Sequence, residues 1–308
     1  MMIFTYNKFY YNSIIMKIID CFMYYDEDVI LDIRLNIMDK YVSHFIICEA
    51  NFNHNGTNRE LQFNINNFKN FKEKIIYIPL RDQPKNLKKI DKLDSQHLRN
   101  SKILDNALLR ENFQRNHLYT KIKDFDEDDL IIIGDVDEIP DLKKFKYKNK
   151  ITFFKQKMFY YKLNLVHQNF IWYGSKICKK KFLKSPQWLR NVKSKKYPKW
   201  RIDTLFSNTK YHDISFVENG GWHFTNIKTP EKIDFKMKNF LHHLEYEESG
   251  LNIEDVKKIV EDKKVFYDHA ADKKANKWNN SAKLVEIEDN LLPEYIISNK
   301  SKFSEWLS

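Results

Sequence analysis

Four short, mostly apolar runs, separated by stretches of helical periodicity, constrain this sequence most. The runs cover residues 18–22, 44–48, 75–79 and 130–133. In residues 27–39 the apolar side chains recur at helical spacing, and Ser95 precedes a second helical stretch that continues to about Lys121. Strands that are apolar on both faces and alternate with helices are typical of parallel sheets covered by helices on both sides. The sequence therefore predicts an α/β fold with a mostly parallel central sheet.

The chain changes character after about residue 150. Residues 151–173 are rich in aromatic, β-prone side chains, and residues 214–217 form another strand-like run. From about Pro230 the pattern is helical and polar, which predicts C-terminal helices. No linker rich in Pro, Gly or Ser and no internal repeat divides the chain. We expect an N-terminal extension at residues 1–16 and a single domain over residues 17–308.

The composition favours an ordinary globular protein. Hydrophobic residues make up 42% of the chain and charged residues 31%, which excludes wholesale disorder. No run of about 18 apolar residues is present, as a membrane-spanning helix would require, and the first residues lack the pattern of a signal peptide. The three cysteines, Cys21, Cys48 and Cys178, lack metal-ligand spacing. We expect a soluble cytoplasmic protein with reduced thiols.

Positive charge is concentrated in one segment. The chain has 53 Lys and Arg against 42 Asp and Glu, a net charge of +11. Residues 176–201 contain basic side chains and no acidic one, and they account for the whole excess. Such a segment is suited to phosphates, nucleic acid or an anionic membrane surface, and a solvated loop is the other interpretation. One alternative function is therefore nucleic-acid binding, with Trp188, Tyr197 and Trp200 interleaved among the cations.

An acidic cluster follows the fourth apolar run. Asp135, Asp137 and Glu138 come directly after the predicted strand 130–133. Ligands of open α/β sheets bind at the carboxyl ends of the strands, and two carboxylates one residue apart can reach one cation where the chain turns. Such oxygen ligands suit Mn²⁺ or Mg²⁺ that also holds a diphosphate. A solvated acidic turn is the alternative. A metal-dependent nucleotidyl or phosphoryl transferase would use the same cluster, although a Walker-type loop is absent.

Several short segments, in their order and spacing, resemble glycosyltransferase family 17, which includes the β-1,4-mannosyl-glycoprotein β-1,4-N-acetylglucosaminyltransferases. The resemblance extends from about Lys17 to the C-terminus. It is carried by residues 19–22 (IDCF), 26–27 (DE), 33–35 (IRL), 45–50 (FIICEA), His54, Gly56, 61–63 (LQF), 110–116 (RENFQRN), 135–140 (DVDEIP), 220–224 (GGWHF), 243–245 (HLE) and 292–295 (LPEY).

The resemblance implies a GT-A-like fold, which is a Rossmann-like α/β/α sandwich. It also implies a UDP-sugar donor (UDP-GlcNAc in the characterised branch), Mn²⁺ or Mg²⁺, a glycan acceptor and inversion at the anomeric carbon. Residues 17–140 would form the nucleotide-sugar-binding half and residues 141–308 the acceptor-side half. No nucleic-acid partner is then expected, and residues 176–201 would be left for peripheral contact with anionic surfaces.

Site residues follow from the motifs. The metal would be held by Asp135, Asp137 and His223, for which a buried structural histidine is the alternative. Arg110 and Arg115 suit a diphosphate, because the guanidinium fork donates two parallel hydrogen bonds; pairing with Glu111 is the other reading. Phe22 and Glu49, at the ends of the first two strands, would contribute to the donor pocket. For Glu49, which would accept from ribose or base, a solvated strand end is the alternative.

An inverting displacement requires a base on the face opposite the leaving diphosphate. The candidates are Glu245, Glu218 and Asp203, and Glu245 is the first choice because it lies in the His-x-Glu segment. A salt bridge on a helix surface is the alternative for Glu245. Asp137 would serve catalysis through the metal. Four tryptophans could stack on sugars, although most aromatic residues are expected in the core: Trp172, Trp188, Trp200 and Trp222.

Overall fold

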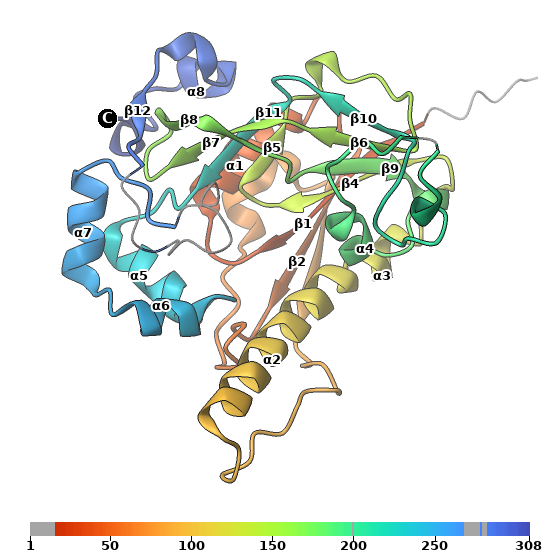
Figure 1. The fold of residues 1–308 in the computed structure, drawn as a ribbon. Helices are drawn as coiled ribbons and strands as arrows, with labels where there is room; N and C mark the ends of the chain where they lie inside the picture. Colours follow the sequence, from red (N-terminus) through yellow and green to blue (C-terminus); the bar gives the residue numbers. More distant parts are fainter. Residues whose placement is uncertain (1–15, 199, 268–277, 279–281) are drawn as a thin grey trace, which may run out of the picture.

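A computed structural model describes residues 16–198, 200–267, 278 and 282–308. Its larger sheet has seven strands in the order β10-β6-β9-β4-β1-β2-β3 (Figure 1). These strands are β1 (Ile18–Tyr24), β2 (His44–Ala50), β3 (Ile75–Leu80), β4 (Leu130–Asp135), β6 (Ile151–Phe154), β9 (Lys176–Lys179) and β10 (Ile214–Val217). β9 runs antiparallel to both its neighbours, whereas the other pairings are parallel. The predicted, mostly parallel sheet is confirmed.

Helices cover both faces of this sheet, as predicted. The side chains of β4 alternate between two cores: Leu130 and Ile132 pack on one side, and Ile131 and Ile133 on the other. The first core includes residues of α1 (Asp28–Met38). Against the second lie α3 (Tyr119–Ile122) and α4 (Pro186–Asn191), and the long helix α2 (Gln96–His117) contacts β1, β2 and α4. Continuous apolar strands are therefore buried on both sides, which is the packing of a GT-A-like α/β/α sandwich.

A second sheet, of five strands, adjoins the first and has the order β12-β8-β7-β11-β5. Its strands are β5 (Glu138–Pro140), β7 (Gln156–Tyr160), β8 (Leu165–Trp172), β11 (Gly221–Thr225) and β12 (Val285–Glu286). The chain passes from β4 of the first sheet to β5 of the second through Val136 and Asp137. The acidic cluster therefore forms the turn that joins the two sheets.

The C-terminal helices are α5 (Pro230–Asn239), α6 (His243–Ser249), α7 (Ile253–Glu261) and α8 (Glu294–Ser298). Ile233, Tyr246 and Val256, from α5, α6 and α7, form a third core with Met158 and Leu165 of the second sheet. α8 instead contacts α1. Short 3₁₀ helices complete the described chain: η1 (Ile65–Phe71), η2 (Leu142–Lys144), η3 (Lys180–Phe182), η4 (Ile202–Thr204), η5 (Asp289–Leu291) and η6 (Ser304–Trp306).

The first part of the basic segment is structural. Lys176 is buried in β9, and its ammonium donates to the carbonyl oxygens of Arg190 and, at 2.9 Å, Val192. Lys179 and Lys181 both pair with Asp128 at 2.7 Å. The interpretation of this segment as a solvated loop is therefore wrong for residues 176–192, which supply a central strand and a packed helix.

Candidate active site

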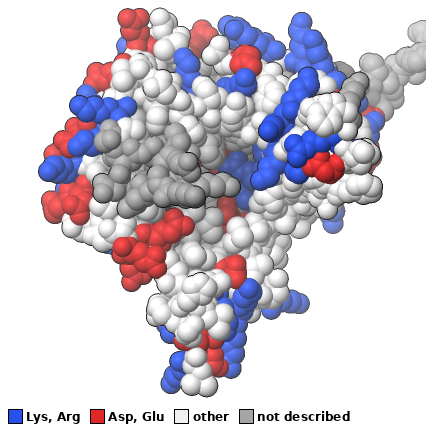
Figure 2. Space-filling view, viewed as in Figure 1, with Lys and Arg blue, Asp and Glu red and all other residues white. Residues whose placement is uncertain are grey.

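A cavity of about 310 Å³ lies between the two sheets and α5, at the carboxyl ends of β1, β2 and β4. Figure 2 shows it as a hollow near the centre of the face, with charged atoms inside. Its wall comes from the segment after β1, the segment after β2, the middle of α2, the acidic turn, β11 and α5 with the residues that follow it. This is the edge at which open α/β sheets bind their ligands, and the volume is at the lower end of the range for ligand pockets.

The acidic turn is held in place by a buried arginine. Arg34, on α1, pairs with Asp20 of β1 at 2.7 Å, and neither side chain is exposed. The same guanidinium donates to the carbonyl oxygens of Asp135 at 2.9 Å and Glu138 at 2.8 Å, and also to that of Val136. These bonds satisfy the backbone of a tight turn that the sheets cannot pair. The position of the acidic side chains is therefore set by α1.

Two arginines neutralise Asp135. One of its carboxylate oxygens accepts from Arg115 of α2 at 3.0 Å, and the other from Arg190 of α4 at 2.8 Å. Burial by itself would raise the pKa of Asp135, but the positive charges of Arg190 and Arg115 outweigh it and hold the pKa well below its ordinary value. Arg115 also pairs with Glu111 at 2.8 Å. Asp135 is thus ionised, with both oxygens in contact with a cation.

Glu138 is the fully buried partner of Arg190. Its two oxygens accept from Arg190 at 2.7 and 2.8 Å. One also accepts from the indole of Trp172 at 2.6 Å, and the other from the backbone of Asp135 at 2.9 Å. The guanidinium of Arg190, a residue of the basic segment, thus lies within the acidic cluster. This role of Arg190 was missed, because nothing in the sequence separates it from the other cations of the segment.

Asp137 and His223 face each other across the cavity wall. The Nε2 atom of His223 lies 3.5 Å from a carboxylate oxygen of Asp137. The pairing of β5 with β11, which sets His223 opposite Glu138, brings the two together. Burial raises the pKa of Asp137, but the neighbouring His223 outweighs it and the net effect is to lower that pKa. The other ring nitrogen of His223 is buried without a hydrogen-bond partner.

These side chains fit a cation in part. A carboxylate and an imidazole are suitable ligands for Mn²⁺. Because Nδ1 of His223 has no hydrogen-bond partner, no hydrogen bond at that nitrogen fixes the orientation of the ring. Both oxygens of Asp135, however, are taken up by arginines. Among the described residues, no three His, Cys, Asp or Glu side chains are grouped so as to hold a metal ion. Any metal here would need oxygen ligands from a diphosphate or from water as well.

Four of the expected donor-site residues do not line the cavity: Arg115, which is buried and paired with Asp135 as described above, and three others. Phe22 is fully buried beneath the guanidinium of Arg34, at 4.5 Å from the ring centre. Glu49 is fully buried and pairs with Arg59 at 3.0 Å. Arg110 donates to the carbonyl oxygen of His54 at 3.1 Å. As placed, these three side chains support the strands and the loop that form the wall.

The three candidate bases have different surroundings. Glu245 accepts from, or shares a proton with, Nδ1 of His242 at 2.9 Å; His242 lines the cavity and Glu245 stands behind it. Glu218 pairs with Lys155 at 2.5 Å on the surface. Asp203 lies between two surface cations and is likewise outside the cavity wall. Of the three, only Glu245 is connected to the cavity.

The four tryptophans are also dispersed. The ring of Trp172 lines the cavity and packs against His223, with the ring centres 5.2 Å apart. Trp188 is buried, and its indole donates to the carbonyl oxygen of Asn208. Trp222 donates to the carbonyl oxygen of Leu291. Trp200 is 79% exposed. Only Trp172 is placed to touch a ligand in the cavity.

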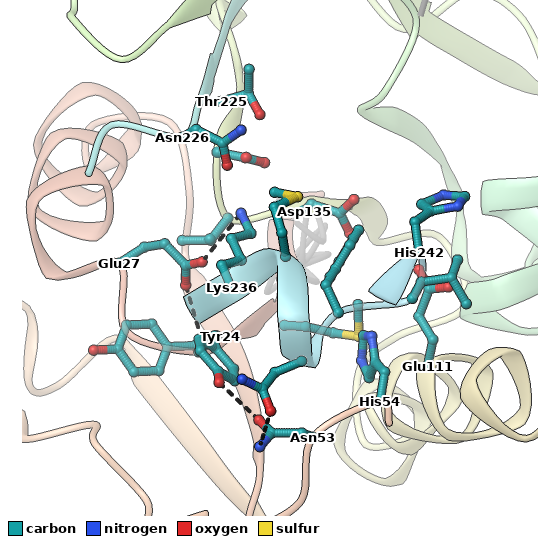
Figure 3. A pocket seen from close by; sticks show the side chains of 18 of the residues that line it. Tyr24, Glu27, Asn53, His54, Glu111, Asp135, Thr225, Asn226, Lys236 and His242 are labelled. Atoms are coloured by element: carbon teal, nitrogen blue, oxygen red, sulfur yellow. Dashed lines mark hydrogen bonds and ion pairs between the residues drawn. The ribbon is translucent and has the colours of Figure 1, made fainter. Parts of the chain in front are cut away.

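The cavity also contains residues to which the sequence analysis assigned no role. Lys236 of α5 extends towards Glu27, with 3.9 Å between the charged atoms (Figure 3). Nδ1 of His54 and the side-chain oxygen of Asn226 are buried without hydrogen-bond partners, and burial lowers the pKa of His54. Buried polar atoms are rarely left unpaired unless a ligand or water meets them. Only Glu27 and His54 had a sequence signal, because they belong to the segments that carry the family resemblance.

The fold is a GT-A-like α/β sandwich, with charged side chains gathered where the central sheet ends. The sequence matches glycosyltransferase family 17 over residues 6–307, and the chain belongs to this family. The resemblance drawn from the short motifs is thereby confirmed. The match begins within the expected N-terminal extension. No curated protein matches the sequence. Within the described residues, no helix has both the length and the apolar character needed to cross a membrane.

Proposed function

We propose that this glycosyltransferase moves a sugar from a UDP-sugar, with UDP-GlcNAc as the first candidate, to a hydroxyl group of a glycan. We further propose that Mn²⁺ or Mg²⁺ is required and that the anomeric carbon is inverted. The observation that carries the proposal is the pairing of Asp137 with His223 on the cavity wall, next to an Asp135 backed by two arginines. The donor sugar and the inversion rest on the family resemblance.

Asp137 and His223 would hold the metal, which would neutralise charge on the departing diphosphate. Arg190 lines the cavity and Arg115 is buried next to Asp135; both guanidinium groups are already oriented by Asp135 and would help to balance the charge of the diphosphate. Groups that are positioned before the reaction stabilise developing charge without reorganisation. Asp135 would therefore keep the two arginines aligned at the edge of the cavity.

The hydroxyl groups of the donor provide partners for the unpaired polar atoms of the cavity. His54, Asn226 and His223 each present a buried nitrogen or oxygen without a hydrogen bond. Burial favours the neutral form of His54, in which one ring nitrogen donates and the other accepts. A sugar or ribose hydroxyl can do both, so it suits such atoms better than a purely apolar ligand does.

The proton of the attacking hydroxyl would pass to His242, with Glu245 as its positioning residue. The bond between Nδ1 of His242 and Glu245 leaves Nε2 as the ring nitrogen available to the cavity. A carboxylate behind an imidazole fixes its tautomer and stabilises the charged form, as in other acid–base pairs. The proposed proton acceptor is therefore His242, and not Glu245 as expected from the sequence.

Calorimetry of UDP binding tests the metal site. We expect UDP to bind in the presence of Mn²⁺ and to bind at least about tenfold more weakly in excess chelator, because the metal would contact the diphosphate. Asp137→Asn should abolish the difference. Asp128→Asn is the matched control, since Asp128 is 57% exposed, pairs with Lys179 and Lys181, and lies outside the cavity wall. Equal affinity with Mn²⁺ and with chelator in the unsubstituted protein would overturn the proposal.

A further inference from the structure

An unusual cluster of apolar side chains is exposed where the chain follows α4. Trp200 is 79% exposed, Ile202 70%, Leu205 74% and Phe206 86%. Among the large apolar side chains that the structure describes, only Leu93 is exposed to a similar extent. Single exposed apolar residues are common, but a contiguous group marks a contact surface.

The backbone beneath these side chains is anchored. Tyr197 is buried, and its carbonyl oxygen lies 3.0 Å from Nδ1 of His212. The other ring nitrogen of His212 lies 2.5 Å from the hydroxyl of Thr204, which is also buried. Further back, the amide of Lys193 donates to the carbonyl oxygen of Thr209 at 2.8 Å. The apolar side chains are therefore displayed outward from a fixed loop.

Lysines flank the apolar cluster. Lys193, Lys195 and Lys196 are exposed, and within the described chain none of them forms an ion pair. A nearby carboxylate, Asp203, is shared by Arg201 and Lys210, at 2.6 and 2.7 Å. Figure 2 shows Lys and Arg side chains gathered beside the central hollow, on the side where the loop after α4 lies in Figure 1. The surface is thus both apolar and cationic.

This surface adjoins the active-site cavity. A shallow hollow beside it is lined by Arg190, Lys193 and Thr209, among others. Arg190 also lines the main cavity, where it holds Asp135 and Glu138. The cationic end of the loop and the acidic turn are therefore connected through one helix, α4.

We propose that Trp200, Ile202, Leu205 and Phe206, with Lys193, Lys195 and Lys196, form a patch that docks on a lipid bilayer with anionic headgroups. Apolar side chains that enter the headgroup region and lysines that contact the phosphates are the two components of interfacial binding. A nucleic acid would use the lysines and stack on an aromatic ring, but it offers no place to bury the aliphatic Ile202 and Leu205. The proposal does not depend on the sugar, metal or stereochemistry proposed above.

Co-sedimentation with lipid vesicles tests this patch, and it requires no enzymatic activity. The full chain should sediment with vesicles that contain phosphatidylserine and stay in solution with phosphatidylcholine alone. Replacing the four apolar residues together by Ser should lower the partition coefficient at least about tenfold. Replacing the three lysines by Ser should lower it by about fivefold for each charge at low salt. The matched control is Leu93→Ser with Leu98→Ser, which removes exposed apolar side chains elsewhere and should change nothing.

Thermal midpoints equal to that of the unsubstituted protein would show that each variant is folded, as expected for changes at exposed positions. Failure of the unsubstituted protein to sediment with anionic vesicles at low salt would overturn the proposal. The proposal would also be overturned if the lysine changes weakened binding and the apolar changes left it intact. Binding would then be purely electrostatic, as it is for a polyanion such as a nucleic acid. Equal loss in the Leu93 and Leu98 control would show that the binding is nonspecific and would also overturn it.

Discussion

Replacing Arg190 by Met should destabilise the protein strongly. The guanidinium is 17% exposed and pairs with Asp135, which is partly exposed, and with Glu138, which is fully buried. Without it, Asp135 keeps Arg115 as a partner, whereas Glu138 keeps only the N–H groups of Trp172 and of the Asp135 backbone. Removing one partner of a buried ion pair costs about 3–5 kcal/mol, because an uncompensated charge remains.

The lower end of that range, about 3 kcal/mol, is expected, since Glu138 still accepts from two N–H groups. Urea unfolding should then show a lower midpoint with an unchanged slope, and the thermal midpoint should fall by roughly 6–12 °C at 2–4 °C per kcal/mol. Adding Glu138→Gln to the variant should recover part of the loss, because it removes the unpaired charge permanently.

The matched control is Arg201→Met, which removes an arginine that pairs with Asp203 at the surface. Exposed pairs are worth about 0–1 kcal/mol, so this variant should unfold close to the unsubstituted protein. The reasoning is refuted if Arg190→Met costs less than about 1 kcal/mol, or if adding Glu138→Gln makes the protein less stable still. Either result would mean that the buried carboxylate does not depend on Arg190.

Three other predictions concern single residues. Glu245→Gln should lower kcat by about 10²-fold and shift its pH profile while leaving UDP affinity unchanged; steady-state rates near wild type across pH would contradict the His242 pair. Arg34→Met should cost about 3–5 kcal/mol in urea unfolding, because Asp20 is left buried without a partner; a loss below about 1 kcal/mol is the contrary result. Burial, helped by the charge of Arg190, lowers the pKa of Lys176 from 10.5 to about 7. The unfolded chain then binds a proton that the folded one lacks above pH 7, so stability should rise with pH between about 7 and 10. Lys176→Met should flatten this rise, and parallel urea-unfolding curves across that range would contradict the burial argument.

Patterns within single segments were enough to predict much of the framework. The strands at residues 18–22, 44–48, 75–79 and 130–133 were predicted because a mostly apolar run is visible in a short window. The second helix begins after Ser95, whose side chain accepts from the backbone of Leu98 as a helix cap. The strand-to-turn arrangement of the acidic cluster was predicted for the same reason, since strand and carboxylates are adjacent in the chain.

The donor-site residues were harder to predict. The sequence does not distinguish a Glu49 that faces a ligand from one that pairs with a buried arginine. Only the fold brings Arg59 next to Glu49. Phe22 likewise gives no sign of lying beneath Arg34. Side chains at the carboxyl end of a strand alternate in direction, and the register of the neighbouring strands determines which of them meets the cavity.

The sequence by itself determined the class of fold, the position of the acidic turn and, through its ordered motifs, the family. Only the tertiary structure decided that β9, drawn from the basic segment, is a reversed strand inside the sheet. It also decided that Arg34, Arg115 and Arg190, on three different helices, meet at one turn. The physical reason is that apolar periodicity is a local property of the chain. The partner of a charged side chain, by contrast, is set by pairings between distant segments, and a lysine or arginine looks alike in sequence whether it is solvated, buried or bound to a carboxylate.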